Sequence, residues 1–253
     1  MKNIFYTILC LITLSGCSGC SKSGRKNQMQ SSGNKVQRPI RNNIPSIRKD
    51  PEISSLSNQP QVNGLFGNLA EMYQRLKPTV FLVEVSYSTG GGAQGSGFFI
   101  TSSGLGVSNY HVFKGGTKGE AYIKMDNTSV LKVGNVLDYN EKLDYIIFEV
   151  ISNNKIFPFV HISDFQPSVG DDVFAIGNPK GLEHTLSKGI VSSYRDNDLL
   201  MQTTAEITHG SSGGALFNMR GEAVGITTAG FGEANLNFAM NLQKLGIKRF
   251  TNR

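Results

Sequence analysis

The chain has 253 residues, which is enough for one large all-β domain or two fused barrels with a buried core. Hydrophobic residues make up 39% and charged residues 17%, and the chain has 29 Gly against 8 Pro, which excludes collagen-like, coiled-coil and wholly disordered classes. The formal net charge of +6 is unevenly distributed: residues 21–60 carry eight Lys or Arg against Asp50 and Glu52, whereas residues 61–253 carry 16 basic and 17 acidic side chains. The body is therefore nearly neutral, and we expect no nucleic-acid partner.

An apolar run at the N-terminus predicts a secretory signal. Lys2 precedes residues 4–14, of which nine in eleven are apolar, and the small residues Ser15 and Gly16 follow. A helix that spans a bilayer needs roughly 20 apolar residues, so this run is too short to remain as a membrane anchor. We expect residues 1–16 to be a cleaved signal peptide and the mature protein to lie outside the cytoplasm.

The end of this signal also predicts a lipid anchor. The segment Leu14-Ser15-Gly16-Cys17 resembles the lipobox of bacterial lipoproteins, in which the cysteine is acylated and becomes the new N-terminus. Cys20 is a poorer candidate because Cys17 occupies the position where a Leu is wanted, and an ordinary signal peptide that contains cysteines is the alternative. Each buried methylene contributes about 0.8 kcal/mol, so several acyl chains would hold the protein on a membrane of the bacterial cell envelope.

The cysteines and the following segment set further limits. Cys10, Cys17 and Cys20 are all of the cysteines, so the rest of the chain holds neither a disulfide nor a cysteine-based metal site.

Residues 21–63 are rich in Ser, Asn, Gln and Gly, with basic residues and scattered Pro, and they show no periodic pattern of apolar residues. We expect residues 17–63 to comprise the lipidated cysteine and a disordered basic tether.

Many short apolar runs follow the tether. Asn68 precedes an apolar pattern from Leu69 to Leu76 that Pro78 ends, which predicts one short helix. A second helix, capped by Asn241, is expected at Leu242–Phe250. The expected strands are Val80–Tyr87, Gly97–Thr101, Ala121–Met125, Val130–Leu137, Tyr145–Ile151, Asp172–Ile176, Gly189–Tyr194, Ala215–Asn218, Ala223–Thr227 and Asn237–Met240. This pattern predicts an all-β domain over residues 64–253, made of two barrels that join near residues 152–170.

A serine within a glycine-rich segment is the first sign of chemistry. Gly210-Ser211-Ser212-Gly213-Gly214 stands directly before an expected strand. A serine hydroxyl attacks a carbonyl only when a base takes its proton and N–H groups stabilise the oxyanion, and glycines expose such backbone donors. In isolation the segment would be read as a turn, because Gly and Ser favour turns for conformational reasons.

A histidine and an acid occur in matching contexts earlier in the chain. His111 follows the apolar run that begins at Val107, and Asp144 opens the run Asp144–Val150. Each is a polar residue of a catalytic type at the end of an expected strand. Their order along the chain, His111, Asp144 and Ser212, is that of the chymotrypsin-type triad.

Several longer segments resemble bacterial trypsin-like serine proteases, and most closely the protease domain of the HtrA (DegP) family. The resemblance covers roughly residues 64–245. The segments that carry it are GSGFFIT (95–101), VSNYHV (107–112), DYIIFEV (144–150), AIGNPKGLEHTLSKGIVSS (175–193) and QTTAEITHGSSGGALFNMRGEAVGITTA (202–229).

The resemblance implies a fold, an activity and roles for residues. It implies the chymotrypsin-like double barrel and a serine endopeptidase that cleaves polypeptides of the cell envelope without a cofactor. His111 would be the general base, Asp144 the acid that orients it, and Ser212 the nucleophile. The backbone N–H groups of Gly210 and Ser212 would form the oxyanion hole.

The chain departs from the family in two places. Ser211 stands where HtrA proteins usually have Asn, and it is a rival nucleophile by residue type, although the position relative to Gly213-Gly214 favours Ser212. The chain also ends soon after its closing helix, so we expect no PDZ module.

Asp138 competes with Asp144 as the acid. It lies in a turn-forming stretch, however, where a hydrogen bond from side chain to backbone explains the presence of an Asp.

The same resemblance places a specificity pocket just upstream of the nucleophile and in a later segment. It would be lined by Glu206, Ile207, Ile226, Thr227 and Thr228. HtrA-like enzymes accept small or medium aliphatic side chains there, whereas a Glu206 carboxylate at the pocket floor would favour Lys or Arg. Because a buried unpaired carboxylate is costly, we expect aliphatic preference.

The remaining histidines carry weaker predictions. His161 and His184 are expected to be loop or partly exposed residues, and His209 is expected either to contact substrate or to lie on the surface. His, Asp and Glu show no metal-ligand spacing, so no metal site is expected. A catalytically silent protein that keeps the barrels and binds envelope or misfolded proteins is the alternative function, against which the complete triad argues.

Overall fold

The computed structural model describes residues 68–116, 120–125, 129–152, 155–178, 184–231 and 236–251. The expected signal peptide, the expected lipidation site Cys17 and the expected tether lie outside these residues. Within the described ranges, no helix has both the length and the apolar character needed to cross a membrane.

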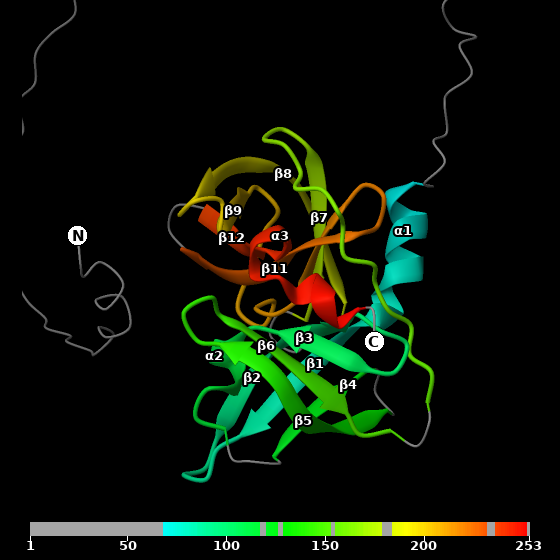
Figure 1. Cartoon of the computed structure of the whole chain (residues 1–253), viewed down its shortest axis with the longest axis vertical. Helices are drawn as coiled ribbons and strands as arrows, with labels where there is room; N and C mark the ends of the chain where they lie inside the picture. The colour runs from blue at the N-terminus through cyan, green and yellow to red at the C-terminus, as the bar shows by residue number, and fades with distance from the viewer. Residues whose placement is uncertain are drawn as a thin grey trace, which may run out of the picture. The chain divides into compact units, whose positions relative to one another are not determined.

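Two closed antiparallel barrels of six strands each form the body of the protein (Figure 1), so the predicted all-β double barrel is confirmed. The first barrel consists of β1 (Val80–Ser86), β2 (Gly92–Phe99), β3 (Leu105–Ser108), β4 (Ala121–Lys124), β5 (Val130–Asn140) and β6 (Tyr145–Val150). The second consists of β7 (Asp172–Gly177), β8 (Thr185–Arg195), β9 (Leu200–Thr203), β10 (Ala215–Asn218), β11 (Ala223–Phe231) and β12 (Leu236–Asn241).

The two barrels share one strand order. The first runs β1-β2-β3-β6-β5-β4, and the second runs β7-β8-β9-β12-β11-β10. In each barrel, the third strand along the chain therefore lies beside the sixth: β3 beside β6, and β9 beside β12. In the first barrel, His111 follows β3 and Asp144 precedes β6. Sequence analysis gave no bounds for β3 or β9, and it identified only the apolar run that begins at Val107, the third residue of β3.

Short helices flank the barrels. Helix α1 (Leu69–Leu76) begins at Asn68, whose side chain accepts a hydrogen bond from the backbone N–H of Glu71, and ends before Pro78 as predicted. Two further short segments are the 3-10 turn η2 (Lys77–Thr79) and helix α2 (Tyr110–Phe113). The predicted continuous helix Leu242–Phe250 is wrong: α3 (Leu242–Leu245) stops at Gly246, which has a φ of 66°, and η4 (Ile247–Phe250) follows as a 3-10 helix.

The strands bury side chains on both faces, which ties the barrels together. Phe99 belongs to the core inside the first barrel, whereas its neighbour Phe98 belongs to a second core that contains residues of both barrels, α1 and η4. In β7 the pattern repeats, with Val173 inside the second barrel and Phe174 in the shared core. Because successive strand residues point to opposite faces, one apolar run supplies both cores.

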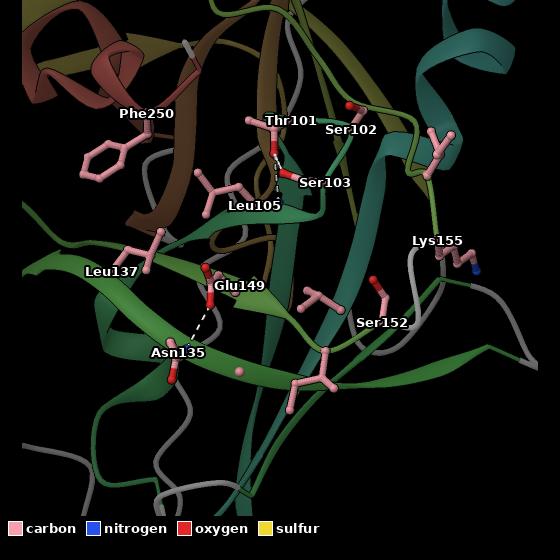
Figure 2. A pocket seen from close by; sticks show the side chains of 14 residues that line it. Thr101, Ser102, Ser103, Leu105, Asn135, Leu137, Glu149, Ser152, Lys155 and Phe250 are labelled. Atoms are coloured by element: carbon pink, nitrogen blue, oxygen red, sulfur yellow. Dashed lines mark hydrogen bonds between the residues drawn. The ribbon is translucent and has the colours of Figure 1, made fainter. Parts of the chain in front are cut away.

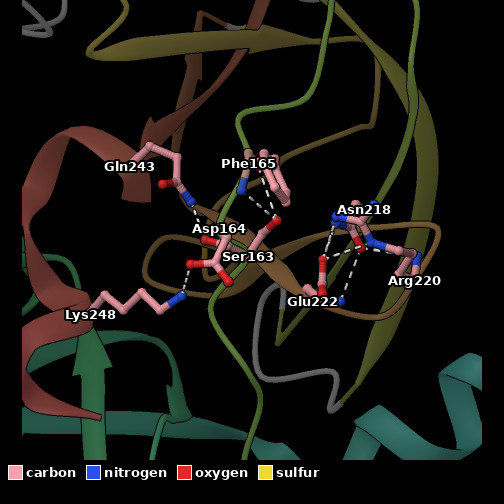
Figure 3. Close-up of polar contacts among 8 residues, drawn as sticks. All are labelled: Ser163, Asp164, Phe165, Asn218, Arg220, Glu222, Gln243 and Lys248. Atoms are coloured by element: carbon pink, nitrogen blue, oxygen red, sulfur yellow. Dashed lines mark hydrogen bonds and ion pairs between the residues drawn. The ribbon is translucent and has the colours of Figure 1, made fainter. Parts of the chain in front are cut away.

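The connection between the barrels, residues 151–171, is hydrogen-bonded to each of them in turn. The N–H of Phe157 donates to Ser102 O at 2.9 Å in the first barrel, and the N–H of Ser163 donates to Ala223 O at 3.0 Å in the second. Figure 3 shows how side chains of the C-terminal helices reach this connection: Gln243 donates to the carbonyl of Ser163, and Lys248 pairs with the neighbouring Asp164. These contacts limit movement of one barrel against the other.

Candidate active site

The pairing of β3 with β6 brings His111 and Asp144 together. Ser108 at the end of β3 lies opposite Ile146 near the start of β6. Helix α2 follows β3 and carries His111, and Asp144 directly precedes β6, so both side chains occupy the same end of the barrel. Their meeting thus follows from antiparallel register rather than from closeness in the sequence.

The carboxylate of Asp144 holds His111 at two points. Its Oδ2 lies 2.8 Å from His111 Nδ1, and its Oδ1 accepts a hydrogen bond from the backbone N–H of His111 at 2.9 Å. A proton on Nδ1 that faces Asp144 leaves Nε2 as the basic nitrogen of the ring. The side chain of His111 is 45% exposed, so Nε2 is accessible for proton transfer.

Two further residues hold Asp144, and sequence analysis assigned this role to neither. Asp144 has a left-handed φ of 46°, a conformation that costs roughly 1–2 kcal/mol in a residue with a side chain. The fully buried Asn109 donates from Nδ2 to the backbone oxygen of Asp144 at 2.8 Å and thereby stabilises this conformation. Thr228, which we had expected in the specificity pocket, has its Oγ1 3.4 Å from Asp144 Oδ2.

The loop that carries Ser212 comes from the second barrel and packs against β2 of the first. The N–H of Ser96 donates to Ser212 O at 2.8 Å. A β-carbon at Gly95 would lie 3.0 Å from Ser212 O and 2.7 Å from Val112 Cγ2, so the backbone of Ser212 and the residue after His111 flank the same glycine. The structure therefore brings His111, Asp144 and the Ser212 segment together at the junction of the barrels.

The hydroxyl of Ser212 does not form a hydrogen bond with His111 in the described part of the chain. Its side chain is almost buried, with the residue 9% exposed. In many enzymes such a contact is long without substrate and shortens only when substrate binds. The site is therefore defined by the contacts of Asp144 with His111 and by the position of the Ser212 backbone, and not by a hydrogen bond between Ser212 and His111.

The turn before Ser212 presents free N–H groups. The N–H of Ser211 donates to Thr208 O at 3.0 Å and closes a turn whose third residue, Gly210, has a φ of 93°. A positive φ at that position is the conformation of a type II turn, for which glycine is favoured. Among the described residues, the N–H groups of Gly210 and Ser212 have no acceptor, and two such donors can stabilise an oxyanion.

Ser211, the rival nucleophile, lies in different surroundings. It lines a cavity of about 170 Å³ together with Glu206, Thr208 and residues of β7 and β8. A β-carbon at Gly177 in β7 would lie 3.2 Å from Ser211 Cβ. Ser211 therefore packs against the second barrel, whereas the backbone of Ser212 is hydrogen-bonded to the first.

The residues expected to line the specificity pocket differ in their burial and in their contacts. Ile207 and Ile226 are buried, and the N–H of Ile207 donates to Asn237 Oδ1 at 3.0 Å. Thr227 is also buried, and its hydroxyl donates to Ser211 O at 2.6 Å. Glu206 is exposed and lies beside β7 and β8. Several of these residues thus support the Ser212 loop from behind.

The other polar residues that we considered make no hydrogen bond to His111 among the described residues. Asp138 accepts hydrogen bonds from Arg249 at 2.5 Å and from the hydroxyl of Tyr145 at 3.1 Å, so it joins β5 to the C-terminal turn. His161 and His209 are exposed, as expected of surface residues. His184 was expected to be a loop or partly exposed residue, but it is buried, with Nε2 3.0 Å from Val80 O.

Neither metal ligands nor the cavities of the first barrel add to this site. The described residues contain no group of His, Cys, Asp or Glu that could hold a metal ion. A cavity of about 700 Å³ lies beside β5 and β6 and is lined by Thr101, Leu137 and Phe250 among others (Figure 2). His111, Asp144, Ser211 and Ser212 are not among the residues that line it.

Comparisons with known proteins agree with this geometry. Residues 95–226 match the family model of the trypsin-like peptidase domain. A probable periplasmic serine endoprotease DegP-like of Rickettsia prowazekii is 34% identical over 212 residues, which are 78% of this chain and 40% of that protein. The magnetosome formation protease MamE of Magnetospirillum gryphiswaldense is 34% identical over 143 residues, which are 53% of this chain and 18% of that protein.

A solved structure is similar as well. The serine endoprotease from Yersinia pestis matches with a TM-score of 0.61 and 28% sequence identity, over 70% of this chain and 64% of that one. The chain spans less than half the length of the curated relatives that it matches.

Proposed function

The chain belongs to the trypsin-like peptidase family, and on that premise we propose that it is a serine endopeptidase that acts through Ser212, His111 and Asp144. The observation that carries the proposal is the pair of contacts, at 2.8 and 2.9 Å, by which Asp144 holds both the ring and the backbone of His111. Such a clamp leaves one nitrogen of an exposed imidazole ready to act as a base, at the point where the Ser212 loop meets β2.

The proposed reaction has two stages. His111 Nε2 takes the proton of the Ser212 hydroxyl as its oxygen bonds to the carbonyl carbon of a peptide, and it then gives that proton to the leaving amine. Asp144 remains ionised and stabilises the imidazolium that forms between these transfers. Water then hydrolyses the acyl-enzyme by the same proton transfers in reverse order. General acid–base help of this kind contributes about 10²–10⁴-fold in rate.

The oxyanion of each tetrahedral intermediate is assigned to the N–H groups of Gly210 and Ser212. Both groups lack an acceptor among the described residues, and both belong to the turn that precedes the nucleophile. Loss of one such donor costs roughly 3–4 kcal/mol of transition-state stabilisation.

Labelling with a fluorophosphonate tests the proposal. We expect the wild-type protein to be labelled and to cleave an unstructured protein such as casein, and Ser212→Ala to lose both properties. Ser211→Ala is the matched control, and it should keep the label. Absence of label on folded wild-type protein would contradict the proposal and would instead support a silent binding protein with the same barrels.

Relatives described as periplasmic support a location outside the cytoplasm. We propose that the protein acts in the bacterial cell envelope, that it is anchored there through lipid on Cys17, and that its substrates are polypeptides of that compartment. The neutral charge of residues 61–253 does not favour a strongly charged substrate.

We further propose that the enzyme cleaves after small or medium aliphatic side chains. Glu206 is exposed beside β7 and β8, where its carboxylate avoids the cost of burial. A peptide-library profile should therefore show aliphatic preference both in wild type and in Glu206→Ala. Dominant cleavage after Lys or Arg that disappears in Glu206→Ala would instead assign the preference to this carboxylate.

A further inference from the structure

Ser96, a residue of the first barrel, makes two hydrogen bonds to the oxyanion turn of the second. Its backbone N–H donates to Ser212 O at 2.8 Å, and its hydroxyl donates to Gly210 O at 2.7 Å. Ser96 is fully buried in β2, where it pairs with Leu82 of β1. A single residue thus contacts both of the residues whose N–H groups are assigned to the oxyanion.

The direction of the hydroxyl hydrogen bond is determined by its other partner. The backbone N–H of Asn178 donates to Ser96 Oγ at 2.8 Å, and Asn178 Nδ2 lies 3.4 Å from the same oxygen. A backbone N–H can only donate and a carbonyl oxygen can only accept. The proton of Ser96 Oγ must therefore point to Gly210 O, and the hydroxyl is saturated from both sides.

The direction of the Gly210 N–H depends on the conformation of this turn. Gly210 has no Cβ and tolerates both signs of φ, so the peptide between His209 and Gly210 can rotate between type II and type I arrangements. In a type I arrangement the N–H of Gly210 would point away from the position of the oxyanion. The structure shows a φ of 93° at this residue, which is the type II arrangement.

Ser96 fixes the peptide that follows Gly210. Its hydroxyl holds the carbonyl oxygen of the Gly210–Ser211 peptide, and Thr208 O holds the N–H of the same peptide at 3.0 Å. A flip of the His209–Gly210 peptide would leave the Gly210–Ser211 peptide in place, so these two hydrogen bonds do not select the sign of φ at Gly210. They instead fix the position of the turn against β2 of the first barrel. We propose that Ser96 is a positioning residue that holds this turn against β2 and thereby keeps the N–H groups of Gly210 and Ser212 at the position of the oxyanion, an inference that rests on the proposed serine endopeptidase activity.

The test compares Ser96→Ala with Thr79→Val. Both variants remove a buried hydroxyl that donates to a backbone oxygen, since Thr79 Oγ1 donates to Leu76 O at 2.6 Å, but Thr79 lies before β1 and outside the site. We expect Ser96→Ala to lower kcat about 10–100-fold with KM within about twofold of wild type, because misdirected donors weaken the transition state and not the ground state. Thr79→Val should leave both constants within about twofold.

A second comparison tests whether a weaker hydrogen-bond donor at position 96 partly restores kcat. Ser96→Cys keeps an S–H group, which donates weakly, at the same position. Its kcat should lie between those of wild type and Ser96→Ala, an order that a purely structural role would not produce. If Ser96→Ala does not fold, the comparison of Ser96→Cys with wild type decides the same point.

Amide hydrogen exchange is a readout that needs no activity. Release of the turn should make the Ser211 amide exchange about three- to tenfold faster in Ser96→Ala than in wild type, while the β1 amides keep their protection. An unchanged kcat together with unchanged Ser211 exchange would overturn the assignment of Ser96. A wild-type protein without turnover would refute the proposed function, and the exchange of Ser211 would still decide whether Ser96 positions the turn.

Discussion

Gly213 and Gly170 share a backbone conformation but differ in their surroundings. Their φ angles are 89° and 98°. A β-carbon at Gly213 would lie 2.2 Å from Ser96 O and 2.3 Å from Ser108 Oγ, whereas a β-carbon at Gly170 would meet nothing within 4 Å. Close packing of the two barrels thus requires glycine at position 213, whereas only the positive φ angle favours glycine at position 170.

Alanine at each position separates these two requirements. We expect Gly170→Ala to lower the free energy of unfolding by roughly 1–2 kcal/mol, the cost of a left-handed alanine, without change in kcat/KM. Gly213→Ala must also displace the Ser212 loop from β2, so kcat/KM should fall by about a hundredfold or more. Urea unfolding and peptide turnover measure the two effects. Equal activity in the two variants would contradict the packing argument.

At the scale of single residues, the sequence predicts site residues of a chemically distinctive type. It does not predict the residues that hold them in place. His111, Asp144 and Ser212 stand in recognisable segments, and the structure brings these segments together. Asn109 and Ser96 are equally close to the site, but their roles depend on Asp144 O and Gly210 O, which are distant in the chain. A residue that acts on another residue's backbone carries no local signal of that contact.

The hairpin between β10 and β11 contains a carboxylate whose charge is stabilised by the fold. Burial alone would raise the pKa of Glu222, but hydrogen bonds from Asn218, Arg220 and Ser163 and the charge of Arg220 outweigh burial and lower the pKa. Figure 3 shows Asn218 and Arg220 directed at this carboxylate. Glu222 therefore links Asn218 and Arg220 within the hairpin.

A lowered pKa makes stability depend on pH in one direction. The contribution of Glu222 is fully present above its pKa in the unfolded chain, near 4.5, and is lost as the pH falls through the lower value of the folded protein. Glu222→Gln should thus be less stable than wild type in urea at pH 7, and the difference should shrink below about pH 4. Glu141→Gln, which removes an exposed carboxylate from a pair with Lys114, is the control. An undiminished difference at pH 3 would contradict the role of the charge.

Elements were predictable where an apolar or alternating pattern marks them, the four-residue strands β4 and β10 included, and not where contacts with neighbouring elements decide the structure. Helix α1 and most strands follow from pattern and capping alone. The break at Gly246 was missed because a glycine inside an apolar pattern is tolerated in many helices, and here η4 instead places Ile247 and Phe250 in the core between the barrels. The short strands β3 and β9 exist because long neighbours provide their hydrogen bonds.

At the scale of the whole molecule, the prediction concerns Cys17, which lies outside the described residues. We expect mass spectrometry of the mature protein to find residues 1–16 removed and acyl chains on Cys17. The protein should sediment with membranes, Cys17→Ser should not, and Cys20→Ser should behave as wild type. Unmodified Cys17, or a mature N-terminus elsewhere, would contradict the anchor.

The sharing of one core and one site between two barrels also constrains how the protein comes into being. Because the chain emerges from its N-terminus, in synthesis and in export alike, the first barrel is available before the Ser212 loop, and domains generally fold in that order. Such an intermediate holds His111 and Asp144 without the proposed nucleophile, and residues such as Phe98 and Ile147 still lack their partners in the second barrel. On the proposed function, proteolytic activity would therefore arise only when the last strands close, so a partly emerged chain would not cleave itself or its neighbours. Any risk of aggregation falls in the interval before closure.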